Sequence, residues 1–157
     1  MSESIRTRLA ALGHELPAVT PAAGNYVSTT RAGNLLFVAG QIPARDGTAV
    51  LCGKLGATID EAQARQAAEL CAVGVLAQLD AAIGGDWSKV ARVVRIGGFI
   101  NAVDTFDGHS RVMNGASDLL VAVLGERGRH ARTSVGVASL PAGAVVEVDA
   151  VIELVAA

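Results

Sequence analysis

The most constraining feature of the chain is the segment VVEVDAVIEL at residues 145–154, in which apolar and polar side chains alternate. Successive side chains of a β-strand point to opposite faces, so every second residue shares a face. One face of this strand would carry only apolar side chains: Val146, Val148, Ala150, Ile152 and Leu154. The other would carry Val145, Glu147, Asp149, Val151 and Glu153. The chain must therefore cover one face of a sheet with a second apolar layer.

Two helices are predicted to supply that layer. Residues 58–85 predict a long helix, with Thr58 and Glu61 as a capping box and Gly84-Gly85 as its end. Its buried side is expected to consist of Ala64, Ala68, Cys71, Val75 and Leu79. Its solvated side is expected to carry a charge ladder of Glu61, Arg65 and Glu69. A second helix is expected between a cap at Asp104 and Gly125.

The other segments predict a short N-terminal helix and further strands. Residues 2–16 have helical spacing of apolar side chains, and residues 26–43 predict a hairpin that turns at 32–34. A third strand is expected near 49–52, and a fourth at 89–102, with a bulge at Gly97-Gly98. The last two strands, 131–138 and 145–154, are expected to form a hairpin across Leu140-Pro141. This order predicts one α+β domain over residues 1–157, with both long helices on one face of a mixed sheet and residues 1–19 as a helical extension.

Composition excludes several classes of protein. Hydrophobic residues make up 51% of the chain and charged residues 18%, which is typical of a globular domain. The net charge of −2 argues against a nucleic-acid module. Neither the two cysteines nor the histidines have metal-ligand spacing, so we expect no metal, and no apolar run predicts a membrane helix. Without a signal peptide, a cytoplasmic location with reduced cysteines is expected.

Two charged residues in the last two strands carry the functional argument. Arg132 and Ser134 belong to the less apolar side of their strand, and a hairpin would place them on the same face as Glu147. An exposed Arg–Glu pair is ordinary cross-strand stabilisation. However, a face this rich in valine is expected to be covered by another subunit. In the resulting cleft a guanidinium suits the binding of a carboxylate, and a partly desolvated glutamate suits a general base.

The chain resembles the Rid family, the RidA or YjgF-type reactive-intermediate deaminases once called L-PSP endoribonucleases. Three segments carry the resemblance: GNLLFVAGQIP at 33–43, ARTSVGVASLP at 131–141 and VVEVDAVIEL at 145–154. The six-residue step from Pro141 to Glu147 agrees with the family. The resemblance implies a chorismate-mutase-like fold and a homotrimer with sites between its subunits. It also implies hydrolysis of small 2-imino acids to 2-keto acids and ammonia, without a metal or organic cofactor.

The resemblance assigns roles residue by residue. It implies that Arg132 binds the substrate carboxylate and that Glu147 activates the attacking water. The backbone at Ser134 would help to hold the imino acid, and the match extends to Tyr26, Gly40 and Asn114. The chain departs from the common pattern where His130-Ala131-Arg132 replaces Pro-Ala-Arg, where Asn25 precedes Tyr26 and where Ser134 replaces cysteine. The N-terminal helix and the loop at 125–130 resemble a longer, less characterised branch.

Other functions stay open at this point. His130, two residues before Arg132, is either a second acid–base group or an ordinary loop residue. The Arg132 cleft could bind a keto or amino acid without turning it over, in a non-catalytic binding module. The basic segment RGRHAR at 127–132 is the sequence feature that would suit an endoribonuclease, but it lacks interleaved aromatic residues.

Overall fold

The computed structural model describes residues 2–157, and side chains from Ile5 onward. The helices are α1 (Ser2–Ala11), α2 (Glu61–Ile83) and α3 (His109–Leu124), with short 3₁₀ helices at Trp87–Lys89, Gly125–Gly128 and Pro141–Gly143. The strands are β1 (Thr29–Ala32), β2 (Leu35–Gln41), β3 (Ala44–Arg45), β4 (Thr48–Ala49), β5 (Val90–Asn101), β6 (Ala131–Val137) and β7 (Val146–Leu154). A five-stranded sheet has the order β1-β2-β7-β5-β6, in which β5 and β6 are parallel and the other pairs antiparallel.

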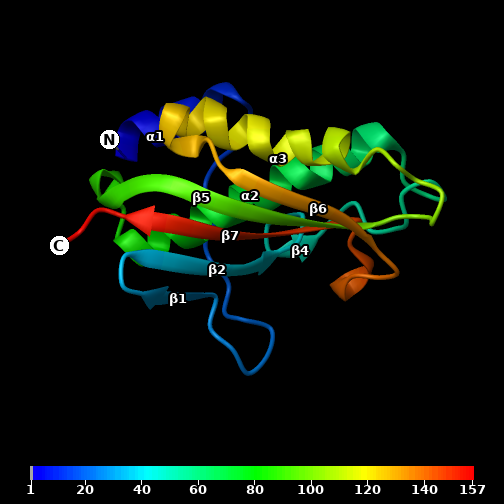
Figure 1. Ribbon diagram of the computed structural model, residues 1–157, viewed down its shortest axis with the longest axis horizontal. Coiled ribbons are helices and arrows are strands. Elements are labelled where there is room, and N and C mark those ends of the chain that lie inside the picture. The colour runs from blue at the N-terminus through cyan, green and yellow to red at the C-terminus, as the bar shows by residue number, and fades with distance from the viewer. Residues whose placement is uncertain (1) are drawn as a thin grey trace.

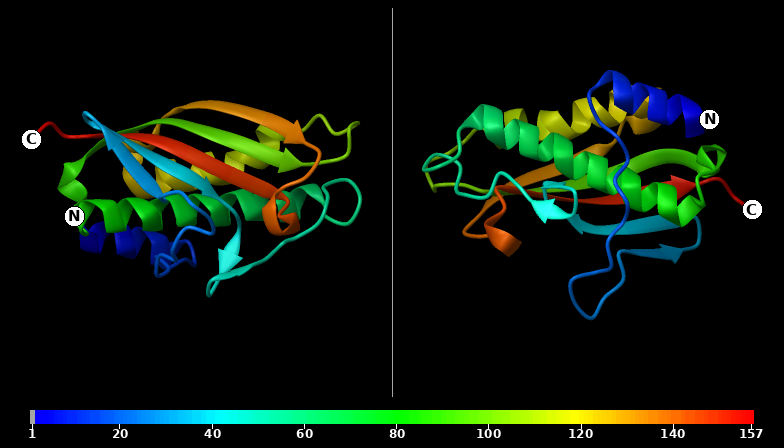
Figure 2. Two further views of the ribbon diagram at one scale, coloured as in Figure 1. Left: turned by 90° about the horizontal axis from the view of Figure 1, so that it is seen from below. Right: turned by 180° about the vertical axis from the view of Figure 1, so that it is seen from behind.

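All three helices lie on one side of this sheet (Figures 1 and 2). The alternation in β7 determines which face of the sheet the helices cover. The apolar side chains of that face are buried against the helices, as predicted: Val146, Val148, Ala150, Ile152 and Leu154. The predicted apolar side of α2 is also buried, from Ala64 to Leu79. By length and composition α2 could cross a membrane, but most of its apolar window is buried as a core helix. The predicted α+β fold with a mixed sheet and a short N-terminal helix is therefore confirmed.

The helix ends differ from the predicted ones. The capping box of α2 is formed by Asp60 and Gln63, each side chain accepting from the other's backbone N–H, at 2.8 and 2.9 Å. Thr58 instead accepts a hydrogen bond from the backbone N–H of Lys54 in the preceding turn. Gly84 ends α2 in the left-handed conformation, as predicted. The cap of α3 is Gly108 and not Asp104.

The charge ladder predicted along α2 was wrong. Glu61 pairs with Arg111, and Arg65 pairs with Asp118, so both ion pairs join α2 to α3. Two helices packed side by side bring these longer-range partners closer than the residue one turn away.

The strand pairings also differ from the predictions. The segments 131–138 and 145–154 do not form a hairpin, because β5 lies between β6 and β7. The helix α3 connects β5 to β6 as a crossover, which makes these two strands parallel neighbours. Near 49–52 the structure has the two-residue β4, paired with β3, and an isolated bridge between Cys52 and Ala144. The irregular register of β5 falls between Val90 and Arg95 and not at Gly97-Gly98; Gly98 instead makes room for the side chain of Met113.

A buried asparagine joins three segments at one end of the sheet. Asn101 is 6% exposed; its Nδ2 donates to the carbonyls of Gly53 and Ala144, and its Oδ1 accepts from Lys54 at 2.7 Å. Lys54 also donates to the carbonyl of Ala138, at 2.8 Å. These bonds hold the connection between β6 and β7 against the end of β5.

Replacing Asn101 with leucine should lower the free energy of unfolding by about 2–3 kcal/mol, because the carbonyls of Gly53 and Ala144 lose this donor and Lys54 loses one of its two acceptors. Urea denaturation followed by circular dichroism measures the loss. Gln66→Leu also replaces a side-chain amide with leucine, but on the exposed side of α2, and should lower the free energy of unfolding by less than about 0.5 kcal/mol. Equal losses in the two variants would contradict this role of Asn101.

Candidate functional site

The predicted site residues fall into two groups on opposite sides of the sheet. Arg132 of β6 is aligned with Ile96 of β5, and Glu147 of β7 is aligned with Phe99. Aligned residues on neighbouring strands share a face, and positions 96 and 99 of one strand point to opposite faces. Arg132 therefore lies on the helix side and Glu147 on the open side. The prediction that they share a face within one chain was wrong, because it depended on the β6–β7 hairpin.

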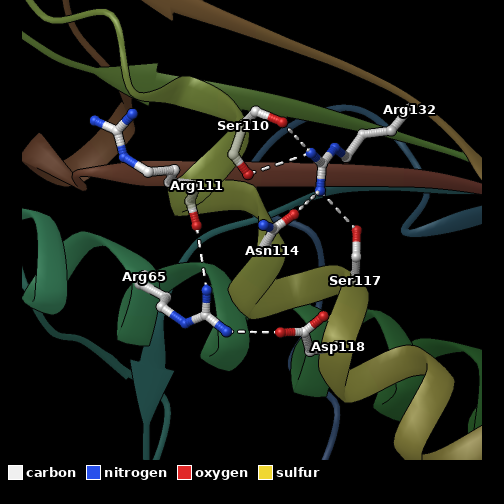
Figure 3. A network of polar contacts seen from close by, with 7 residues as sticks. All are labelled: Arg65, Ser110, Arg111, Asn114, Ser117, Asp118 and Arg132. Atoms are coloured by element: carbon white, nitrogen blue, oxygen red, sulfur yellow. Dashed lines mark hydrogen bonds and ion pairs between the residues drawn. The ribbon is translucent and has the colours of Figure 1, made fainter.

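The first group, called here the Arg132 group, consists of Arg132, Ser110, Asn114, Ser117 and Ser134. Figure 3 shows the guanidinium reaching from β6 to α3. Its Nη1 donates to Asn114 Oδ1 and Ser117 Oγ, both at 3.0 Å. Its Nη2 donates to the backbone oxygen and the Oγ of Ser110, at 3.2 and 2.7 Å. All these acceptors are uncharged, and no carboxylate of the described chain pairs with Arg132, so its positive charge is not neutralised.

Ser110 and Ser117 were not among the site residues predicted from the sequence. A signal for them was present, because residues 110, 114 and 117 follow the i, i+4, i+7 spacing of one helix face. On a helix that covers the Arg132 strand, such a polar stripe marks the contact with the arginine.

His130 belongs to this first group through Ser117. Its Nδ1 lies 2.6 Å from the carbonyl oxygen of Gly128, and its Nε2 lies 2.8 Å from Ser117 Oγ. Because a carbonyl only accepts, we assign the ring proton to Nδ1, which leaves Nε2 to accept the serine hydroxyl. Burial lowers the pKa of His130, and the charge of Arg132 adds to this effect, so the neutral ring is favoured. His130 thus orients the serine that holds Arg132.

Ser134 occupies a distinctive place beneath α3. Its Oγ is buried and finds no hydrogen-bond partner within the described part of the chain. The strand that carries it, β6, is the edge of the sheet, so one side of its backbone has no strand neighbour. A polar atom of this kind is available to a partner from outside the chain.

The second group, called here the Glu147 group, lines a cavity of about 320 Å³. It includes Glu147, Gly40, Tyr26, Gln41 and Pro141. Gly40 leaves room for the carboxyl group of Glu147, since a Cβ atom at this position would collide with it and displace that side chain. Burial raises the pKa of Glu147, and the nearby carboxylate of Asp149 adds to this effect. A half-buried carboxyl group with a raised pKa, and with no ion pair to residues 5–157, is well suited to accept a proton from water.

The open face of the sheet, on which Glu147 lies, also carries apolar side chains. Phe37 and Val135 are 40% and 41% exposed there, and Phe37 is aligned with Val151. The charged side chains of Glu147, Asp149 and Arg95 lie on the same face. A sheet face of this composition is typical of a surface that another subunit covers.

The arginines of the basic segment 127–132 are engaged within the chain. Arg127 donates to the carbonyls of Trp87 and Val90, and Arg129 pairs with Glu126. With Arg132 bound to α3, all three arginines make contacts within the chain.

A mixed sheet backed by helices on one side is the architecture of the chorismate-mutase-like class of proteins. Residues 6–154 match the family model described as "YjgF/chorismate_mutase-like, putative endoribonuclease". The chain therefore belongs to the YjgF family, and the resemblance to RidA-type proteins is confirmed.

Three relatives show where the chain stands in this family. "Protein TCP17" of Trypanosoma cruzi is 46% identical over 154 residues, which cover 98% of this chain and 96% of the relative. The structure of Atu1372 from Agrobacterium tumefaciens, a protein of unknown function, has a TM-score of 0.93 at 49% identity and covers 98% of this chain and 94% of its own. RidA from Psychrobacter sp. has a TM-score of 0.56 at 27% identity and covers 85% of this chain and 92% of its own. The chain is thus more similar to Atu1372, over nearly its whole length, than to this RidA.

Proposed function

We propose that the protein hydrolyses small 2-imino acids to 2-keto acids and ammonia, at sites between the subunits of a homotrimer. The supporting observation is the separation of the two groups. The Arg132 group has an unneutralised cation and no carboxylate, whereas the Glu147 group has a carboxylate and no cation. A contact that places the Arg132 group of one subunit against the Glu147 group of the next joins two different surfaces. Contacts of this head-to-tail kind close into rings, and the family resemblance favours a ring of three.

The chemistry requires little beyond orientation and a proton carrier. Arg132 binds the carboxylate of the substrate and thereby presents C2 of the protonated imine to water. Glu147 accepts a proton as the water oxygen bonds to C2, and it returns that proton to the nitrogen. The hydroxyl proton of the tetrahedral intermediate then passes to Glu147 as the C–N bond breaks. The products are the 2-keto acid and ammonia, which leaves with the remaining proton as ammonium.

Arg132 can reach a carboxylate without leaving its place on the sheet. Its Nε–H makes no hydrogen bond to the described residues, whereas both Nη atoms are occupied. A carboxylate that binds side-on to Nε and Nη2 displaces only the exposed Ser110 and leaves Asn114 and Ser117 to hold Nη1. The arginine is therefore prepositioned for the substrate.

Hydrolysis of freshly generated 2-iminopropanoate and 2-iminobutanoate tests the proposal. The protein should accelerate the release of keto acid and ammonia well beyond the spontaneous rate. Binding of the corresponding keto acid without turnover would support the non-catalytic binding module instead. An absence of both would contradict each of these functions.

Assembly can be tested on the open face. Val135→Glu introduces a buried charge if this face is covered, so we expect monomers in size-exclusion chromatography with light scattering, and loss of imine hydrolysis with them. Leu12→Glu is a matched control, because Leu12 is 42% exposed against 41% for Val135 and lies after α1 on the helix side. A monomeric wild-type protein, or a trimer in both variants, would contradict the proposed interface.

A further inference from the structure

Gln78 is a largely buried residue whose side-chain amide has no hydrogen-bond partner in the described chain. It lies on α2, is 9% exposed and follows the apolar residues Val75 and Leu76 on a helix that is otherwise buried through alanine, valine and leucine. None of the hydrogen bonds found in residues 5–157 involves its side chain. The amide atoms are not fully enclosed but open onto a cavity, where water or a ligand can satisfy them. An amide of this kind that lost such a partner would cost about 1–3 kcal/mol. Gln78 is therefore expected to face something other than protein.

Two cavities meet at Gln78. The larger, of about 320 Å³, is the one that Glu147 lines, and the smaller, of about 80 Å³, extends over α2. Both are lined by Thr20, Gln41, Ile42, Ala44, Gly47 and Gln78. The chain after α1 crosses α2 here before it loops beyond β1 (Figure 2, right), and residues 17–23 contribute to the walls. The two cavities thus form one chamber that leads from the proposed catalytic carboxyl group to the buried amide.

The lining of the chamber is largely apolar, and most of its polar side chains are uncharged. Gln41 donates through Nε2 to the carbonyls of Ala39 and Gly40, at 3.0 and 3.4 Å, which orients its amide at the junction. Thr20 adds a hydroxyl. The charged side chains of the lining are Glu147 and Asp46, and both are acidic. An acidic ligand group would be repelled here, and an apolar one would leave Gln78 unsatisfied.

We propose that this chamber receives the side chain of the imino acid and selects substrates with an uncharged carboxamide. An amide of the ligand can donate to and accept from the amide of Gln78, so that both groups are satisfied at once. A site built to bind a polar group discriminates strongly against an analogue that lacks this group, because its own buried group is left unpaired. The inference rests on the proposed function and names the substrate class of the same site.

Isosteric pairs of substrates test the inference. Imines are generated in place from asparagine and its isostere leucine, and from glutamine and its isostere 2-amino-5-methylhexanoate, by an L-amino-acid oxidase with oxygen. In one of the two pairs, kcat/KM of the wild type should favour the amide by about 10-fold or more. In Gln78→Leu this preference should disappear, while 2-iminopropanoate is still hydrolysed. Gln78→Met provides a second, unbranched variant, and Gln66→Leu on the exposed side of α2 should keep the full preference.

The possible outcomes distinguish a failure of amide selection from a failure of the proposed imine hydrolysis. Equal rates within both pairs, a preference that survives in both Gln78 variants, or a faster reaction of the arginine-derived imine would each overturn the selection of amides. In those cases the turnover of 2-iminopropanoate would still support the proposed function. If the wild type hydrolysed no imine, 2-iminopropanoate included, the proposed function and this inference would fail together.

Discussion

Glu147→Gln should lower kcat/KM for 2-iminopropanoate by about 100-fold or more, the range expected when a positioned general base is removed. Glutamine has the shape of glutamate and can stay beside Gly40, but it cannot take a proton from water. In the wild type, burial and Asp149 raise the pKa of Glu147, so kcat/KM should fall as the pH is lowered through that raised pKa. The variant should lack this step in its pH profile.

Stability distinguishes this loss from misfolding. A carboxyl group with a raised pKa binds more protons in the folded state, so the free energy of unfolding falls as the pH rises from the unfolded pKa through the folded one. Glutamine removes that penalty, and the Tm of the variant at neutral pH should equal or exceed that of the wild type. Asp149→Asn is the matched control: it should keep its activity and shift the acid limb of the profile to lower pH. A Glu147→Gln variant within about threefold of the wild-type rate would exclude Glu147 as the base.

Arg132→Ala should lower kcat/KM by about 100-fold or more, mainly through a higher KM, because charge-assisted hydrogen bonds to a carboxylate contribute about 1.5–3 kcal/mol each. The four bonds from Arg132 to α3 also anchor the edge strand β6. We therefore expect the free energy of unfolding to fall by about 1–3 kcal/mol. Steady-state kinetics and urea denaturation measure the two effects separately.

Two further variants isolate the role of the guanidinium. Arg132→Lys keeps the charge but loses the planar fork, so it should recover part of the stability and little of the kcat/KM. Arg65→Ala removes an arginine that also contacts α3, through Asp118 and the backbone of Arg111 (Figure 3). As an exposed pair it should cost less than about 1 kcal/mol and leave the kinetics unchanged. A KM for Arg132→Ala equal to that of Arg65→Ala would contradict carboxylate binding by Arg132.

Local patterns predicted most of the elements correctly. The alternation along β7 identified its buried face residue by residue, and the turn at Gly33 identified the β1–β2 hairpin. The apolar side of α2 and its end at Gly84 followed from helical spacing and from the left-handed conformation that glycine adopts readily. These features depend on residues within a few positions of one another, so the sequence displays them directly.

Other features depended on partners far along the chain. The cap of α2 shifted from Thr58 to Asp60 because Thr58 is used in a turn with Lys54. No sequence pattern distinguishes Gln78, since a single glutamine on a long helix can be either exposed or buried. Only the tertiary structure shows that it is buried beside a cavity.

The sequence by itself determined the fold class, the family and the two residues, Arg132 and Glu147, on which the proposed chemistry depends. Only the tertiary structure decided how these residues are related. Alternation states which side chains share a face within one strand, but it does not state which strand lies beside it. The insertion of β5 between β6 and β7 is set by the crossover through α3, a long-range contact that no local pattern records. That insertion places Arg132 beneath the helices and Glu147 on the open face.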